Sequence, residues 1–236
     1  MVGPLSSARS RRVPATRPGK AGGRRDANRK RRISQLIDSA VALFLERGIT
    51  AVTIDAIVER AGVAKGSFYH YFGDKDELVA VMMAPVRDGF RAAMARCADR
   101  LARTESPDEL PAAYLELAAG IARVIVQHPG LVRLYLQESR SPAVGARRPL
   151  RELADELTEG AIALSTVARD YGLLSDSDPR LGALTVIGAG EQILWAYLNG
   201  ADLGPPAAIP RTLIAIILDG VRQRGLSTKN RSTSSA

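Results

Sequence analysis

A short stretch of the chain, from Thr53 to Lys75, concentrates side chains that suit contact with nucleic acid. Lys65 can reach a phosphate oxygen or the edge of a guanine base, and Gly66 lets the backbone come close to another molecule. Groups that can donate hydrogen bonds follow at once along the chain, on Ser67, Tyr69, His70 and Tyr71. These residue types at this spacing favour double-stranded DNA as the partner.

Catalytic chemistry has few candidate residues. The sequence holds one cysteine, Cys97, and two histidines, and it lacks the G-x-S-x-G, H-E-x-x-H and phosphate-loop motifs. We therefore expect no enzyme activity, no metal site and no cofactor. The single cysteine also excludes a disulfide within the chain, which fits a cytoplasmic protein.

Three short helices are predicted to position the polar stretch. Apolar residues at helical spacing indicate a first helix from about Asn28, and Gly48 ends it. Thr53 can cap a second helix at about 54–60, and Gly62 suits a tight turn. A third helix at about 64–71 follows, with Phe68 turned to the domain core. This order is that of a helix-turn-helix, whose last helix enters the DNA major groove.

The segment TIDAIVERAGVAKGSFYHYFGDKDEL, residues 53–78, resembles the signature of the TetR family of transcriptional regulators. The resemblance is close over about residues 30–80. It implies that Thr53 caps the second helix and binds phosphate, and that Lys75 also meets phosphate. It further implies that the DNA is lined by Lys65, Gly66, Tyr69, His70 and Tyr71.

The second helix departs from the family pattern. Asp55 and Ala56 replace a common basic–acidic pair, and Val58 replaces a more typical alanine. We expect the Asp55 carboxylate to repel the DNA backbone locally, because both groups are anionic.

The rest of the chain predicts further helices and no strands. A long helix at about 75–103 contains Pro85, and Pro, Gly and Ser breakers separate five more segments. These are expected at about 107–127, 130–140, 148–171, 179–199 and 205–224. The fold class is therefore all-α with about nine helices: an N-terminal helix-turn-helix domain at 28–74, then a helical ligand-sensing and dimerisation domain at 75–225.

The helices at 179–199 and 205–224 are apolar on more than one face, which a surface helix of a monomer does not tolerate. The resemblance implies that two subunits pair these helices into a four-helix bundle, giving a homodimer. The other interpretation is that they form the buried centre of one domain.

A pocket for a small hydrophobic effector is implied among the middle helices, again by the resemblance. Taken alone, each candidate residue is more often part of a packed core than a ligand contact. The candidates are Phe90, Met94, Tyr114, Leu117, Leu134, Tyr135 and Trp195.

The positive charge of the chain is localised. Residues 1–32 hold eleven lysines and arginines against Asp26 alone, so the remaining residues sum to −2 of the total of +8. Residues 1–27 are expected to form a disordered basic arm, and 226–236 a disordered tail. The arm can bind DNA phosphates or a groove, solubilise the protein, or anchor it to a membrane surface, and the DNA-binding interpretation is favoured.

Together these features predict a ligand-responsive regulator, a repressor that binds a pseudo-palindromic DNA operator as a dimer and is released by its effector. The alternative is a DNA-binding protein that responds to no ligand. No uninterrupted apolar run reaches the length of a membrane span, so no membrane partner is expected.

Overall fold

A computed structural model describes residues 23–104, 106–171, 178–205 and 208–221 of the 236-residue chain. All regular structure in these ranges is helical, which confirms the predicted fold class. The α-helices are α1 (Arg24–Arg47), α2 (Ile54–Ala61), α3 (Lys65–Tyr71), α4 (Lys75–Leu101), α5 (Leu110–Gln127), α6 (Pro129–Glu138), α7 (Arg148–Asp170), α8 (Pro179–Leu198) and α9 (Ile209–Val221); the 3-10 turns are η1 (Pro107–Glu109) and η2 (Gly145–Arg147).

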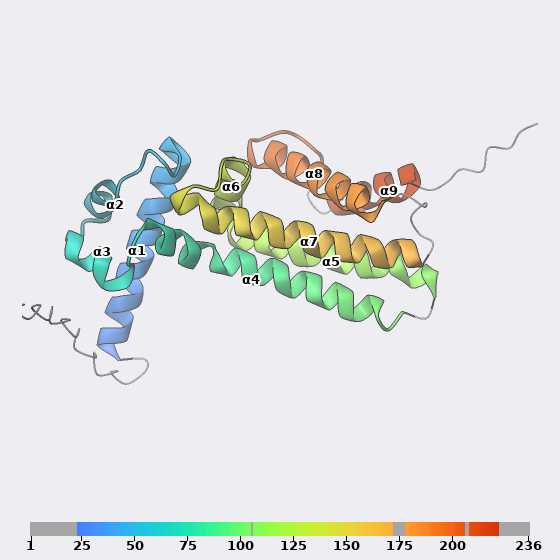
Figure 1. Ribbon diagram of the computed structural model, residues 1–236, viewed down its shortest axis with the longest axis horizontal. Helices are drawn as coiled ribbons and strands as arrows, with labels where there is room; N and C mark the ends of the chain where they lie inside the picture. The colour runs from blue at the N-terminus through green and yellow to red at the C-terminus, as the bar shows by residue number, and fades with distance from the viewer. Residues whose placement is uncertain (1–22, 105, 172–177, 206–207, 222–236) are drawn as a thin grey trace, which may run out of the picture.

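Helices α1 to α3 form a compact unit at one end of the molecule (Figure 1). Its core is made by apolar side chains from all three helices, including Phe44, Ile57 and Phe68, none of which is exposed. Three aromatic or branched side chains removed from water in this way each contribute about 1.5–3 kcal/mol to folding. This core is continuous with buried residues of α4, including Leu78 and Met82, so the small unit packs onto the larger part.

The second part of the molecule is built on three long helices, α4, α5 and α7, which run along its long axis (Figure 1). Helix α4 packs against both α5 and α7, and α8 covers α7. Small residues permit the α4–α5 crossing: a Cβ on Gly89 would lie 2.5 Å from a methyl carbon of Val124. The short helix α6 lies where the two parts meet, in contact with α1, α4 and α8.

Several helix boundaries differ from the sequence expectations. Helix α1 begins at Arg24, so the last residues of the expected arm, Arg24 to Ala27, are helical. Pro129 is the first residue of α6 rather than a residue before it, as suits a residue whose missing N–H would have no helical partner. The last helix begins at Ile209 instead of 205. The rest of the arm, residues 1–22, and the tail at 226–236 lie outside the described residues.

Candidate DNA-binding interface

The turn between α2 and α3 fixes the angle of the third helix. Thr53 caps α2, with its side-chain oxygen accepting a hydrogen bond of 3.2 Å from the Ala56 N–H, as predicted. Gly62 takes a φ of +65°, in the left-handed region where a side chain is disfavoured. The N–H of Val63 then bonds to the carbonyl of Val58 at 3.0 Å. These local bonds determine where α3 leaves the turn.

Helix α3 has one buried face and one exposed face. Phe68 is fully buried and Phe72, directly after the helix, is 2% exposed, so these two aromatics anchor α3 to the domain core. Their rings lie 5.5 Å apart in a tilted arrangement. Tyr69, 53% exposed, follows Phe68 by about 100° around the helix, and its ring lies edge-on to the Phe68 ring at 5.4 Å.

The predicted DNA contacts divide according to these faces. Lys65, Gly66, Tyr69 and His70 are exposed to solvent, whereas Ser67 and Tyr71 are half-buried. Tyr71 packs against the core cluster, so a contact of its ring with DNA is more restricted than the resemblance implies. The exposed set combines a cation, a backbone without a side chain, a phenol and an imidazole, which together can meet phosphates and base edges.

An acidic side chain also lies on this surface. The Lys65 Nζ is 2.7 Å from the Asp55 Oδ1, and both side chains are exposed. The hydrogen bond to Asp55 raises the pKa of Lys65 above its ordinary value. Asp55 was expected to repel DNA; the ion pair with the first residue of α3 was not anticipated, because the turn geometry that joins them is not apparent from spacing alone.

Lys75, at the start of α4, makes contacts within the protein. Its Nζ donates hydrogen bonds to the carbonyl oxygens of Ile49, at 2.8 Å, and Val52, at 2.7 Å. Burial lowers the pKa of this ammonium, since desolvation disfavours the charged form. Two of its three donors are therefore used on the turn between α1 and α2, and one remains for the phosphate contact that the resemblance implies.

The same turn also accepts a contact from α6. The Glu138 carboxylate is 3% exposed and accepts hydrogen bonds from the Ile49 N–H at 3.3 Å and from the Arg147 Nε at 2.7 Å. Lys75 and Glu138 thus bond to backbone groups of one turn in the DNA-binding unit from two elements of the larger part. Glu138 was missed from sequence, where no signal pairs it with a residue 89 positions earlier.

Exposed cations also lie at the start of α1. Arg25, Arg29, Lys30, Arg31 and Arg32 all lie exposed in its first turns. Lys30 forms an ion pair of 3.3 Å with Asp26, one helical turn earlier. This positive cluster belongs to the DNA-binding unit, so it can add phosphate contacts to those of α3.

The predicted effector residues do not line one cavity in the described part of the chain. Phe90, Leu134 and Tyr135 are buried in the packed core, and the Tyr135 hydroxyl donates to Glu191 of α8 at 2.9 Å. Tyr114 donates to the Leu164 carbonyl at 2.7 Å. Leu117 is half-buried, and Trp195 lies on the exposed side of α8.

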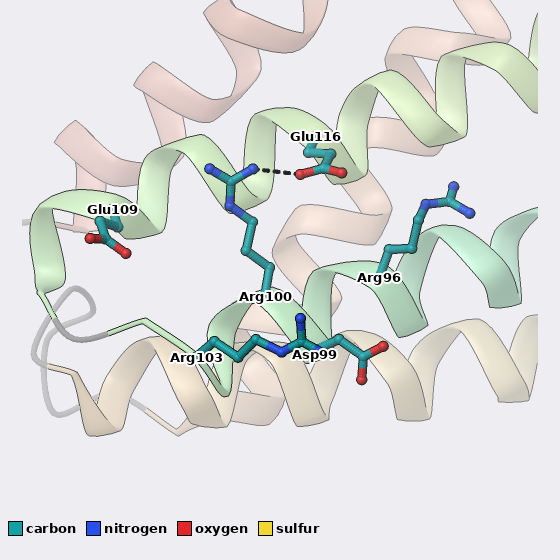
Figure 2. Close-up of a pocket in the computed structure, with 6 residues that line it drawn as sticks. All are labelled: Arg96, Asp99, Arg100, Arg103, Glu109 and Glu116. Carbon is teal, nitrogen blue, oxygen red and sulfur yellow. Dashed lines mark hydrogen bonds and ion pairs between the residues drawn. The ribbon is translucent and has the colours of Figure 1, made fainter.

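Two surface depressions are present instead in the described ranges. The first, of about 400 Å³, lies between the end of α4 and the start of α5, and Figure 2 shows its charged lining of three arginines and three acids, with Arg100 bonded to Glu116 at 2.6 Å. The second, of about 410 Å³, lies between α4 and α7 and has an apolar floor that includes Met94, Leu157 and Leu164. Only the second suits a hydrophobic ligand.

Helices α8 and α9 carry exposed apolar side chains. Ala183 is the only buried residue of α8, whereas Leu181 on α8 and Ile216 on α9 are each 63% exposed. By length and composition α5 and α8 could also span a membrane, although charged residues interrupt the apolar sequence of both. Helix α8 holds Glu191 in an ion pair of 2.9 Å with Arg140, and a charged residue near the middle of a lipid-facing helix is costly.

Cys97 offers no reactive thiol. It is 2% exposed, and burial raises its pKa to about 11, so the thiol stays protonated at neutral pH.

Comparison with known proteins assigns the N-terminal unit. Residues 36–82, which contain α2 and α3, match the family described as "Bacterial regulatory proteins, tetR family". The HTH-type transcriptional repressor KstR2 of Mycobacterium tuberculosis is 36% identical over 78 residues, which are 33% of this chain and 38% of that protein. The chain thus aligns with well under half the length of that relative.

Two further proteins are similar over longer ranges. The HTH-type transcriptional regulator BetI of Brucella anthropi is 30% identical over 149 residues, covering 55% of this chain and 75% of BetI. The structure of the transcriptional regulator FadR from Bacillus subtilis, in complex with stearoyl-CoA, has the same fold at a TM-score of 0.59 and 17% identity, covering 80% of this chain and 99% of that one. The chain belongs to the TetR family of bacterial regulatory proteins.

Proposed function

We propose that the protein is a DNA-binding transcriptional repressor of the cytoplasm, which binds a pseudo-palindromic operator as a homodimer and is released by a small hydrophobic effector. The observation that carries the proposal is helix α3, whose buried Phe68 leaves Lys65, Gly66 and Tyr69 exposed on one face. A helix anchored in this way presents its polar side to the major groove. The names of the relatives, a repressor and a regulator, support it.

The exposed apolar side chains of α8 and α9 support a dimer through these helices. A second copy would remove Leu181, Leu184 and Ile216 from water, and an obligate interface of this kind buries more than about 2,000 Å². Two-fold symmetry of the protein then requires two matching half-sites in the DNA, one for each α3.

Selection from a random duplex library, followed by footprinting, tests this function. The full chain is expected to enrich an inverted repeat and to protect both half-sites when the dimer binds. Protection of one unrepeated half-site by a monomer would contradict the dimeric arrangement, and failure to enrich any sequence would contradict the regulatory function.

For the effector we propose the groove between α4 and α7. Its floor is apolar, Arg91 and Glu156 pair at its rim, and α4 connects it directly to the turn that Lys75 holds. That FadR was crystallised with stearoyl-CoA supports an acyl compound as the first class to examine. A ligand that binds only the folded state raises the melting temperature.

A thermal-shift screen of fatty acids and their CoA esters tests the groove. We expect a hit to stabilise the parent protein and to weaken its DNA binding. Ala163→Trp, which fills the groove from an exposed position, should abolish the shift, whereas Ala92→Trp on exposed surface outside the groove should retain it. If no compound stabilises the protein while DNA binding is intact, the alternative of a ligand-independent DNA-binding protein is favoured.

A further inference from the structure

We propose that Asp55 is a positioning residue that holds Lys65 for contact with a base edge and away from the phosphate backbone, and so raises the sequence discrimination of the protein. The inference rests on the proposed function, since it concerns how α3 meets DNA. It gives Asp55 a role beyond the local repulsion expected from its charge.

The geometry joins two short helices through one ion pair. Asp55 lies in the first turn of α2, two residues after the Thr53 cap, and Lys65 is the first residue of α3. The 2.7 Å contact spans the turn whose shape the left-handed Gly62 fixes. Because the Thr53 cap fixes the start of α2 and buried Phe68 anchors α3, the carboxylate lies in a defined position beside the ammonium.

The chemistry of the pair distinguishes two acceptors on DNA. An ammonium has three donors, so Lys65 can bond to Asp55 and still offer two to the O6 and N7 of a guanine. These base atoms carry only partial negative charge, so they repel a carboxylate much less than an anionic phosphate does. A phosphate is anionic, and its approach to Lys65 brings it close to Asp55 as well. The pair therefore tolerates a guanine edge and disfavours a phosphate.

Sequence-independent binding should be affected most. Complexes with random DNA are held chiefly by cations on phosphates, whereas the operator complex adds base contacts. With Asp55 in place, Lys65 contributes little to binding of random DNA and fully to binding of the operator. The specificity ratio rises because binding to competing DNA falls.

Binding isotherms of the full chain test the proposal, with the duplex enriched from the random library and a random-sequence duplex of equal length as probes. Asp55→Asn should bind the random duplex about fivefold more tightly. Its affinity for the enriched duplex should change by less than about twofold. The salt dependence on random DNA should steepen by about 0.9 log units per log unit of salt, because one more phosphate is neutralised. Asp55→Glu keeps the charge and should retain weak binding to random DNA.

The matched control is Glu59→Gln, which removes the same charge from an exposed position of the same helix. It should leave the specificity ratio unchanged. A double-mutant cycle then asks whether Asp55 acts through Lys65: in a Lys65→Ala background, Asp55→Asn should have no further effect on random DNA.

Three results would overturn the inference: equal specificity ratios for parent and Asp55→Asn, an equal gain from Glu59→Gln, or a full Asp55→Asn effect without Lys65. The last two results would mean that Asp55 acts only by repelling the DNA phosphates and not by positioning Lys65. Each is distinct from a failure of the proposed function, in which the parent itself enriches no sequence.

Discussion

At the scale of single residues, Gly66 is the position where an effect on DNA binding is easiest to distinguish from an effect on folding. A Cβ added there meets nothing within 4 Å in the free protein. We expect Gly66→Ala to stabilise α3 slightly, by about 0.5–1 kcal/mol, because alanine loses less backbone entropy than glycine. Operator affinity should nevertheless fall by about tenfold, since the methyl group stands where DNA must approach.

Thermal melts and operator binding on the same samples check this prediction. Gly62→Ala is the matched comparison, because its positive φ makes a side chain unfavourable and should lower stability. An unchanged operator affinity for Gly66→Ala would place the DNA on another surface.

Lys75 should contribute to stability in the absence of DNA. Replacing it with methionine removes the donor from two backbone carbonyls, those of Ile49 and Val52. Leaving them unsatisfied costs about 1–3 kcal/mol. Denaturant unfolding of the free protein measures this loss. A lysine that served only to contact phosphate would leave the free energy of unfolding unchanged and alter DNA binding alone.

At the scale of elements, α6 is held to the DNA-binding unit by a buried acid. Glu138→Ala would leave Arg147 without its partner and the Ile49 N–H without an acceptor. Because the Arg147 side chain is 23% exposed, water can partly replace its lost partner, and the cost is about 1–3 kcal/mol. We expect a correspondingly lower free energy of unfolding, with earlier hydrogen exchange at the Ile49 amide.

Glu138→Gln serves as the comparison for that measurement. It keeps a side-chain oxygen for the Ile49 N–H but loses the charge that pairs with Arg147, so its loss of stability should be smaller. Equal unfolding energies for all three proteins would mean that α6 does not hold this turn.

Local signals predicted the elements well, and contacts between distant elements poorly. The Thr53 cap and the Gly62 turn act within a few residues of their positions, so both could be recognised from sequence and were confirmed. The start of α1 was placed about four residues late, because the arginine-rich segment before Asn28 lacks apolar periodicity although it is helical.

The position of the ligand pocket could not be predicted from sequence, because it depends on how the helices pack. Which of Phe90, Tyr114 and Tyr135 line a pocket is decided by how α4, α5 and α6 cross, and the structure uses them in the core or in hydrogen bonds between helices. The groove between α4 and α7 is lined by the predicted candidate Met94, but also by Arg91 and Glu156, which no apolar pattern identifies as ligand contacts.

At the scale of the whole molecule, the N-terminal positive charge divides into five cations that precede α1 and six that lie within it. Deleting residues 1–22 removes Arg9, Arg11, Arg12, Arg17 and Lys20 and leaves α1 complete from Arg24. We expect weaker binding to all DNA and a shallower salt dependence, by about 0.9 log units for each phosphate that the arm no longer neutralises.

Isotherms for full-length and shortened protein at several salt concentrations give both quantities. Preference among operator variants should be kept, because α3 is unaltered. Equal slopes would show that the arm only solubilises the protein, and a collapse of preference would show that it reads bases in the minor groove.

The position of Trp195 has an optical consequence. It is the only tryptophan of the chain, it is 36% exposed, and it lies on the helix proposed to join two subunits. The intrinsic tryptophan fluorescence of the protein therefore reports only on the surroundings of Trp195 on α8. As the dimer forms with rising concentration, the indole should move into less polar surroundings and its emission should shift to shorter wavelengths. Leu184→Glu, which puts a charge on the same helix, should keep the long-wavelength emission of the monomer at every protein concentration. The association constant of the dimer can therefore be measured from intrinsic tryptophan fluorescence, without an added label.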